Sequence, residues 1–236
     1  MCSCGSKMTV DSVSIIIPVY NESKNIDSLL DFLAPKRGQC EIIFVDGGSS
    51  DDTVARIKDR GETVVLSPCK GRANQMNHGA SLAAGEIFWF LHADSKPPAD
   101  ALYQIREVLD NGYRIGCFPI QFDSNHPLML VNALMSNLRV CVRNIAFGDQ
   151  GIFLHRALFA EIGGYAAIPL MEDYQLSLDA AKAGCRIGMA RGKIVTSARR
   201  YVKHGRLRTI LHMQLLQHRF RRGDDINEIA RAYNRR

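Results

Sequence analysis

The stretch Ile87-Phe88-Trp89-Phe90-Leu91-His92-Ala93-Asp94 places five apolar residues directly before a histidine and a carboxylate. Gly85 precedes this run and Ser95-Lys96-Pro97-Pro98 follows it, which is typical of a strand that is buried on both faces. Such strands lie in the middle of parallel sheets, and ligands gather outside their carboxyl ends. The stretch therefore predicts an α/β fold with Asp94 at a ligand-binding edge. The alternative is that Asp94 only shapes the turn before Pro97.

Strands and helices alternate on both sides of this central strand. We expect further strands over 13–18, 41–45, 64–66, 116–122 and 152–154, with Pro18 ending the first and one wet face on the fourth. We expect helices that open near 21–23 and 49–53, and further helices over about 72–84, 99–109, 128–142 and 174–183. This alternation with short loops predicts a Rossmann-like, mostly parallel sheet with helices on both faces.

Length and composition fit one globular α/β domain with a small C-terminal extension. The 236 residues are 46% hydrophobic and 23% charged, which are ordinary values for a globular protein. Seven scattered cysteines, and no apolar segment behind Met1, indicate a reducing, cytoplasmic location. Cys2 and Cys4 are either half of a metal site or, as we favour, part of an unstructured terminus. No run approaches the roughly 18 apolar residues that span a bilayer.

Positive charge is concentrated in the last part of the chain. Of the formal net charge of +6, residues 199–236 carry eleven Lys/Arg and three Asp/Glu, or +8, which leaves −2 for residues 1–198. We therefore divide the chain into a domain over 13–198 and a basic helical extension over 199–236. Nucleic acid is not an expected partner, because the extension lacks interleaved aromatic residues and a known motif.

The extension has an apolar side between residues 206 and 222. It is formed by Leu207, Ile210, Leu211, Leu215 and Phe220. Three occupants are open for this side: the domain itself, a second copy in a homodimer, or an anionic membrane at the inner face of the cell envelope.

Carboxylates follow two of the expected parallel strands and begin one helix. Asp46 follows the strand over 41–45, Asp94 follows the central strand, and Glu172-Asp173 stands at a helix start. A carboxylate that faces a bound diphosphate needs a divalent cation, and Mg²⁺ or Mn²⁺ takes one or two such ligands. The alternative gives Asp46 to a turn and Asp173 to a helix cap.

Four blocks of this sequence resemble the family 2 glycosyltransferases of GT-A fold, and in particular a compact bacterial subgroup. The blocks are IIIPVYNE over 15–22, EIIFVDGGSSDDT over 41–53, GEIFWFLHAD over 85–94, and Gly163-Gly164-Tyr165 with Glu172-Asp173. The resemblance covers residues 13–185 in the order of the family. It implies an inverting transfer of one sugar from a nucleoside diphosphate sugar, usually linked to UDP, to an acceptor hydroxyl.

The resemblance also implies a role for each matching residue on the donor side. Asp46 matches the position that hydrogen-bonds the nucleotide base, and Asp94 matches the final Asp of the Asp-X-Asp motif, which binds Mg²⁺ or Mn²⁺. Other donor-binding positions are Pro18, Tyr20, Glu22, Arg72 and Ala93. His92 stands where the first Asp of the motif is usual.

On the acceptor side, the resemblance implies that Asp173 is the general base and that Glu172 is its partner. Asp149 and Gln150 match acceptor-binding positions, and the acceptor is a lipid, a lipid-linked sugar or another hydroxyl compound. His204 is a further candidate ligand of the metal from a C-terminal flap, and the neighbouring Arg199 and Arg200 are candidates for phosphate contact. The Gln-X-X-Arg-Trp motif of processive synthases is absent, which implies a single transfer per encounter.

Two other functions compete with sugar transfer. A nucleotidyltransferase would carry a Gly-rich basic loop after the first strand, where this chain has Val19-Tyr20-Asn21-Glu22. A nucleotide-sugar-binding module at the membrane surface would bind the donor without turning it over, which the histidine at position 92 would suit.

Overall fold

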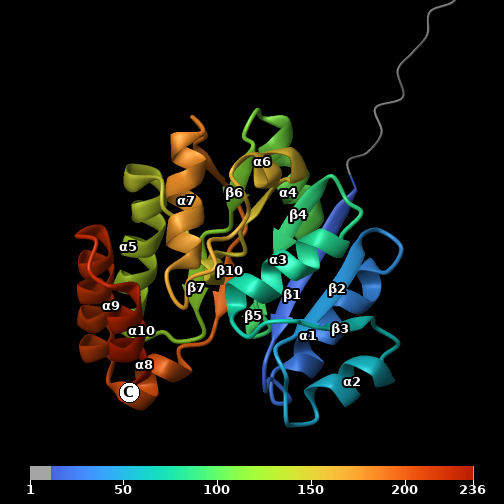
Figure 1. Cartoon of the computed structure of the whole chain (residues 1–236), viewed down its shortest axis with the longest axis horizontal. Helices are drawn as coiled ribbons and strands as arrows, with labels where there is room; N and C mark the ends of the chain where they lie inside the picture. The colour runs from blue at the N-terminus through green and yellow to red at the C-terminus, as the bar shows by residue number, and fades with distance from the viewer. Residues whose placement is uncertain (1–11, 236) are drawn as a thin grey trace, which may run out of the picture.

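Two sheets form the frame of the part of the chain that the structure describes (Figure 1). The structure is a computed structural model and describes residues 12–235, so the prediction for Cys2 and Cys4 lies outside the described residues. The main sheet has seven strands in the order β3-β2-β1-β4-β8-β6-β9, and a smaller sheet has three in the order β5-β10-β7. Strands β1 to β4 are parallel, while β8 is antiparallel to both of its neighbours. The predicted mostly parallel α/β sheet is confirmed.

The bounds of the elements follow the predicted alternation. In chain order they are β1 (Val13–Val19), α1 (Ile26–Leu33), η1 (Ala34–Lys36), β2 (Glu41–Asp46), α2 (Thr53–Asp59), β3 (Val64–Leu66), α3 (Arg72–Leu82), β4 (Ile87–Phe90), β5 (Ser95–Lys96), α4 (Ala101–Asp110), β6 (Ile115–Cys117), β7 (Ile120–Phe122), α5 (Pro127–Arg143), η2 (Gly148–Gln150), β8 (Phe153–His155), α6 (Arg156–Glu161), α7 (Glu172–Lys182), β9 (Ile187–Met189), β10 (Ile194–Thr196), α8 (Arg199–His204), α9 (Arg206–Arg221) and α10 (Ile226–Asn234).

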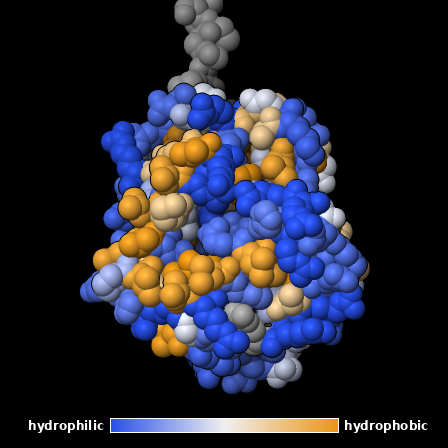
Figure 2. Space-filling view, turned by 90° about the vertical axis from the view of Figure 1, so that its left-hand side faces the viewer, coloured by the Kyte–Doolittle hydropathy of each residue, from blue (hydrophilic) through white to orange (hydrophobic). Residues whose placement is uncertain are grey.

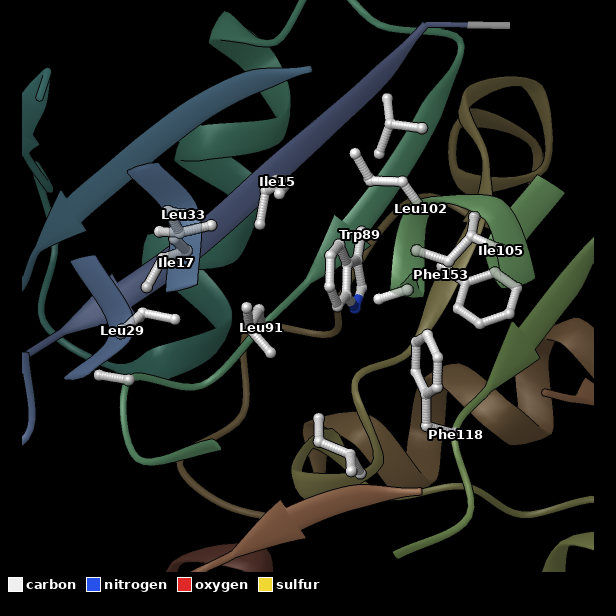
Figure 3. Packing of buried hydrophobic residues seen from close by; sticks show 14 of the residues in the cluster. Ile15, Ile17, Leu29, Leu33, Trp89, Leu91, Leu102, Ile105, Phe118 and Phe153 are labelled. Atoms are coloured by element: carbon white, nitrogen blue, oxygen red, sulfur yellow. The ribbon is translucent and has the colours of Figure 1, made fainter. Parts of the chain in front are cut away.

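The central strand β4 is buried on both faces, as its apolar run predicts. Ile87 and Trp89 belong to a cluster under α1 and α4, and Phe88 and Phe90 belong to a cluster under α3, α6 and α7. Figure 3 shows Trp89 surrounded by residues of several elements, among them Phe118 and Phe153. Burial on both faces fixes β4 in the sheet and brings the residues after Phe90 to its carboxyl edge.

Two of the predicted strands have other bounds in the structure. The strand expected over 116–122 is two strands, because β6 joins the main sheet while β7, after Phe118 and Pro119, joins the small one. Pro18 does not end β1, which continues to Val19 with Pro18 in register with Val45. β4 pairs with β1 only as far as Ile16, so the missing N–H of Pro18 costs no ladder bond on that side.

The C-terminal helices α8, α9 and α10 lie beside α5 and below α7 (Figure 1). Leu216 of α9 and Ile229 of α10 are buried in one cluster with Ile145, Met171 and Tyr174. The start of α7 is therefore covered by the extension. The division of the chain at residue 198 stays a prediction.

Candidate active site

A cavity opens at the carboxyl edge of β1 and β4, opposite the start of α7. Its polar lining includes Glu22, Arg72, Asp94, Asp149 and the Glu172–Asp173 pair. A second hollow adjoins it through Pro18, Glu22 and Arg72, and adds Tyr20 to the lining. Ala93 also lines the main cavity. The structure thus brings together most of the predicted site residues.

The second hollow is built by two loops that are held to each other by hydrogen bonds. The N–H of Asn21 donates to Ser49 Oγ (2.9 Å), the N–H of Ser50 donates to Asn21 Oδ1 (2.8 Å), and the N–H of Glu22 donates to Thr53 Oγ1 (2.8 Å). These bonds fix the chain after β1 against the chain after β2, so the hollow exists without a ligand.

Asp46 serves the turn that follows β2. Its carboxylate accepts the N–H of Gly48 (2.9 Å) and the hydroxyl of Ser49 (2.6 Å), and it is buried. Gly47, rather than Asp46, lines the hollow. This is the turn role that the sequence left open for Asp46, and its contact with a nucleotide base stays a prediction.

The Glu172–Asp173 pair begins α7, directly after a residue in an unusual conformation. Met171 has a φ of +65°, in the left-handed region that costs a non-glycine residue of order 1–3 kcal/mol. The two oxygens of Asp173 accept the N–H of Gly148 (2.7 Å) and the N–H of its own neighbour Tyr174 (2.7 Å). The carboxylate is thus fixed between η2 and α7.

Burial raises the pKa of three carboxyl groups in this cluster, those of Glu172, Asp173 and Asp149. The pKa of Glu172 is raised to about 7, first by burial and then by the charge of Asp173, against the opposing effect of Arg72, whose Nη1 lies 3.6 Å from Glu172 Oε1. Burial also raises the pKa of Asp173, although the N–H of Gly148 works against it. The pKa of Asp149 is raised to about 6 by burial, opposed by Arg139. The site can therefore hold a proton near neutral pH.

Asp94 is the carboxylate best suited to a divalent cation. Among residues 12–235 it has no hydrogen-bond or ion-pair partner, and it lines the same cavity as Arg72. In the same range, no group of three or more His, Cys, Asp or Glu side chains is placed to hold a metal alone. One carboxylate fits Mg²⁺ or Mn²⁺ when phosphate oxygens and water supply the other ligands.

Comparison with known proteins gives this geometry a family. A family model described as glycosyl transferase family 2 matches residues 14–163, more than half of the chain. The chain belongs to this glycosyltransferase family. It is 32% identical, over 67% of its length, to the PGL/p-HBAD biosynthesis glycosyltransferase of Mycobacterium bovis, of which it covers 64%. It is also 32% identical over 117 residues, 45% of its length, to the undecaprenyl-phosphate 4-deoxy-4-formamido-L-arabinose transferase of Klebsiella pneumoniae, of which it covers 36%.

Solved structures agree on the GT-A fold of this glycosyltransferase. TarS of S. aureus, in a complex with UDP-GlcNAc, superposes with a TM-score of 0.63 over 79% of this chain and 58% of its own, at 17% identity. Glucosyl-3-phosphoglycerate synthase of Mycobacterium tuberculosis, in a complex with Mn²⁺, UDP-glucose and phosphoglyceric acid, gives 0.60 over 76% and 69%, at 21% identity. The resemblance stated from the sequence is confirmed.

Besides Asp46, two further predicted residues line neither hollow of the glycosyltransferase. Gln150 is fully buried, where its Oε1 accepts from the N–H of Phe147 (3.1 Å) and from Arg139 (3.1 Å). His204, the last residue of α8, is absent from the lining. Gln150 therefore supports the η2 turn that carries Asp149, and the ligand role of His204 stays a prediction.

His92 is a neutral imidazole under the η2 turn. Its Nε2 is buried without a hydrogen-bond partner among the described residues, and a Cβ on Gly148 would lie 2.6 Å from that atom. Burial, with a contribution from Arg72, lowers the pKa of His92 well below 6.5. A larger residue at position 148 would clash with the imidazole, so glycine is needed there. Because Gly148 has no side chain, the His92 imidazole and the Asp173 carboxylate can both lie close to its backbone.

The lining of the main cavity also includes residues that the sequence did not single out. Tyr201 of α8, Met213 of α9 and Tyr233 of α10 line the main cavity, together with Arg200. The Arg200 guanidinium donates to the hydroxyl of Tyr233 and lies 3.8 Å from the centre of its ring. The basic residues at 199–200 were the only sequence feature that pointed to this part of the cavity. Nothing in the sequence pairs Arg200 with a tyrosine 33 positions later.

Proposed function

We propose that this glycosyltransferase moves one sugar per encounter from a UDP-linked donor to an acceptor hydroxyl, with inversion at the anomeric carbon. The carrying observation is that the buried Glu172 and the half-buried Asp173 line one cavity with Asp94 and Arg72. A base and a diphosphate site on one cavity are what a single displacement needs.

The donor side consists of the two adjoining hollows. Pro18, Tyr20 and Glu22, with Asp46 behind them, are proposed to hold the nucleotide, while Arg72 and Ala93 lie toward the diphosphate and the sugar. Asp94 is the proposed ligand of Mg²⁺ or Mn²⁺. Such an ion, when bound, stabilises the negative charge of the departing nucleoside diphosphate. The synthase of M. tuberculosis, crystallised with Mn²⁺ and UDP-glucose, supports this proposal.

On the acceptor side, Asp173 is the proposed general base. It takes the proton of the acceptor hydroxyl while the acceptor oxygen bonds to the anomeric carbon, and the bond from that carbon to the diphosphate oxygen breaks. Glu172, with a pKa near 7, shares the cavity as a largely protonated neighbour below that pH. Asp149, on the η2 turn that Gln150 supports, is proposed to contact the acceptor.

The proposed acceptor is a lipid or a lipid-linked sugar at the cytoplasmic side of an anionic membrane. The name of the undecaprenyl-phosphate transferase from K. pneumoniae supports a lipid-linked acceptor, although this chain covers only 36% of that protein. The charge of +8 on residues 199–236 supports a place at an anionic surface. Among residues 12–235, no helix has the length and apolar character to span a bilayer.

The test is single-turnover release of UDP from UDP-glucose and UDP-N-acetylglucosamine with Mn²⁺ or Mg²⁺, with water as the acceptor. Asp173→Asn should slow release at least about a hundredfold, or roughly 2.7 kcal/mol of barrier, because the amide cannot take a proton. UDP binding, measured by titration, should persist.

Glu172→Gln is the matched control, since it changes the neighbouring carboxylate of the same helix turn. Collapse of release in this variant, with Asp173→Asn near wild type, would make Glu172 the base. Release at the wild-type rate in both variants would refute the mechanism. Binding of UDP by the wild-type chain without release from either sugar nucleotide would favour the module without catalysis.

A further inference from the structure

Helix α5 turns an uncharged apolar stripe toward solvent. Its members are between 48% and 72% exposed: Leu130, Val131, Leu134, Met135, Leu138 and Val142. The opposite side of the helix is held in the fold by the buried Met129 and Val140. A contiguous apolar surface of this kind marks a contact site.

A second exposed stripe lies on α8 and α9. Val202, Leu207, Leu211 and Leu215 are between 53% and 60% exposed, and the three leucines recur every four residues along one side of α9. The apolar side predicted from the sequence included Phe220 as well as these leucines, and its occupant was left open. The structure divides that side, because Phe220 packs into the fold with Leu216 while Leu207, Leu211 and Leu215 stay exposed.

The two stripes lie on one side of the molecule, because α5 and α9 are in contact. Figure 2 views this side, and its apolar side chains gather in adjacent bands with hydrophilic residues around them. We name the ten exposed residues of the two stripes the α5–α9 face.

The helices that carry the α5–α9 face are basic. Residues 199–222 contain eight Lys/Arg and no Asp/Glu, although Arg219 and Arg222 pair with Asp224, and α5 adds the exposed Arg143 without an acidic residue. A symmetric dimer through this face would place each basic surface against its own copy, where like charges repel. A surface with negative charge above an apolar layer complements both the basic residues and the apolar side chains of the α5–α9 face.

We infer that the α5–α9 face docks on an anionic phospholipid bilayer, with its leucines among the acyl chains and Lys203, Arg206 and Arg208 at the headgroups. Interfacial helices bind in this way, by apolar area and electrostatic attraction together. Membrane docking does not depend on the proposed function. Only its consequence for the acceptor rests on that function. Tyr201 and Met213 of the cavity wall come from the same two helices, so docking places the acceptor side of the cavity next to the bilayer.

The test is sedimentation of the full chain with vesicles of phosphatidylcholine alone or mixed with phosphatidylglycerol. The wild-type chain should bind the mixed vesicles, and salt should weaken the binding. The double variant Leu134→Glu/Leu211→Glu should bind at least about tenfold more weakly, because each change puts a like charge against the membrane and removes an inserted side chain. Arg206→Gln/Arg208→Gln should weaken binding to the mixed vesicles and reduce its salt dependence.

Leu66→Glu is the matched control, since Leu66 is 69% exposed on the edge strand β3, away from this face. It should bind like wild type. Equal binding by the double variant and the wild type, or no binding by the wild type at low salt, would overturn the inference. So would a concentration-dependent dimer that the double variant loses while neither form binds vesicles. These vesicle measurements contain no sugar nucleotide, so they separate the membrane surface from the proposed transfer, which UDP release tests alone.

Discussion

At the scale of single residues, the site separates two adjacent carboxyl groups by their surroundings. Asp173 accepts two backbone N–H groups, which stabilise its charge, whereas Glu172 lies 3.6 Å from Arg72 and has a pKa of about 7. Burial raises the pKa of both groups, and the hydrogen bond from Gly148 lowers that of Asp173. The two backbone N–H groups support Asp173, rather than Glu172, as the proposed base, because they fix its carboxylate at the cavity.

The raised pKa of Glu172 predicts a pH dependence of stability. A carboxyl group whose pKa is higher in the folded chain stabilises the fold below its ordinary pKa of 4.5, and this contribution is lost as pH rises through about 7. The free energy of unfolding should therefore fall between about pH 5 and 8, and Glu172→Gln should reduce that fall by up to about 3 kcal/mol. Urea unfolding across this range measures both.

The exposed Glu86→Gln should leave the pH profile unchanged. Parallel profiles for Glu172→Gln and wild type would mean that Glu172 stays charged, held by Arg72.

Sequence patterns identified the residues at the ends of long elements better than those inside turns. Asp94 and Asp173 reach the cavity because a buried strand and a helix start place them there. Asp46 and Gln150 instead accept hydrogen bonds from their own loops, from Gly48 and Phe147. Whether a polar side chain binds its own loop or a ligand depends on local backbone angles, which residue types alone do not fix.

At the scale of elements, the C-terminal helices complete the site. The apolar residues of α9 lie on more than one side of the helix, so periodicity could not say which side faces the fold. The structure resolves this through Leu216, which is buried against the cluster that contains Met171 and Tyr174. The start of α7, and with it Asp173, therefore depends on packing from α9.

Leu216→Ala should consequently lower the free energy of unfolding by about 2–5 kcal/mol, the usual cost of a cavity in a core. It should also slow UDP release, because Met171 and the first turn of α7 lose support. Thermal unfolding and single-turnover release measure the two effects.

Leu215→Ala changes the adjacent exposed residue of the same helix and should alter stability by less than about 0.5 kcal/mol. A similar loss in both variants would show that α9 is not packed as described.

At the scale of the whole molecule, the sheet order brings distant segments to one edge. The parallel strands β1 to β4 were predictable because each is apolar and bounded by turn residues. Strands β5, β9 and β10 were not predicted, since two or three residues carry no period, and the equally short β3 was recognised only as an apolar run between two expected helices. Yet β10 is followed directly by Ser197 and α8, which line the cavity. A strand that the sequence did not predict therefore positions this wall of the cavity.

The two adjoining hollows predict that one ligand should stabilise the molecule as a whole. UDP that spans them would join the loops after β1 and β2 to Asp94 after β4. Because a ligand that binds only the folded state adds to stability by mass action, UDP with Mn²⁺ at about 100 times its dissociation constant should add about 2.7 kcal/mol. Thermal unfolding with and without EDTA should show that the metal supplies part of this gain, and UMP, which lacks the second phosphate, should gain less from Mn²⁺.

Asp94→Asn should lose the metal-dependent part and keep the part that UDP gives alone, while Asp110→Asn, an exposed carboxylate on α4, should behave like wild type. A full metal-dependent gain in stability for Asp94→Asn would show that Asp94 is not a ligand of the metal. Arg72 would then be the remaining candidate for contact with the diphosphate.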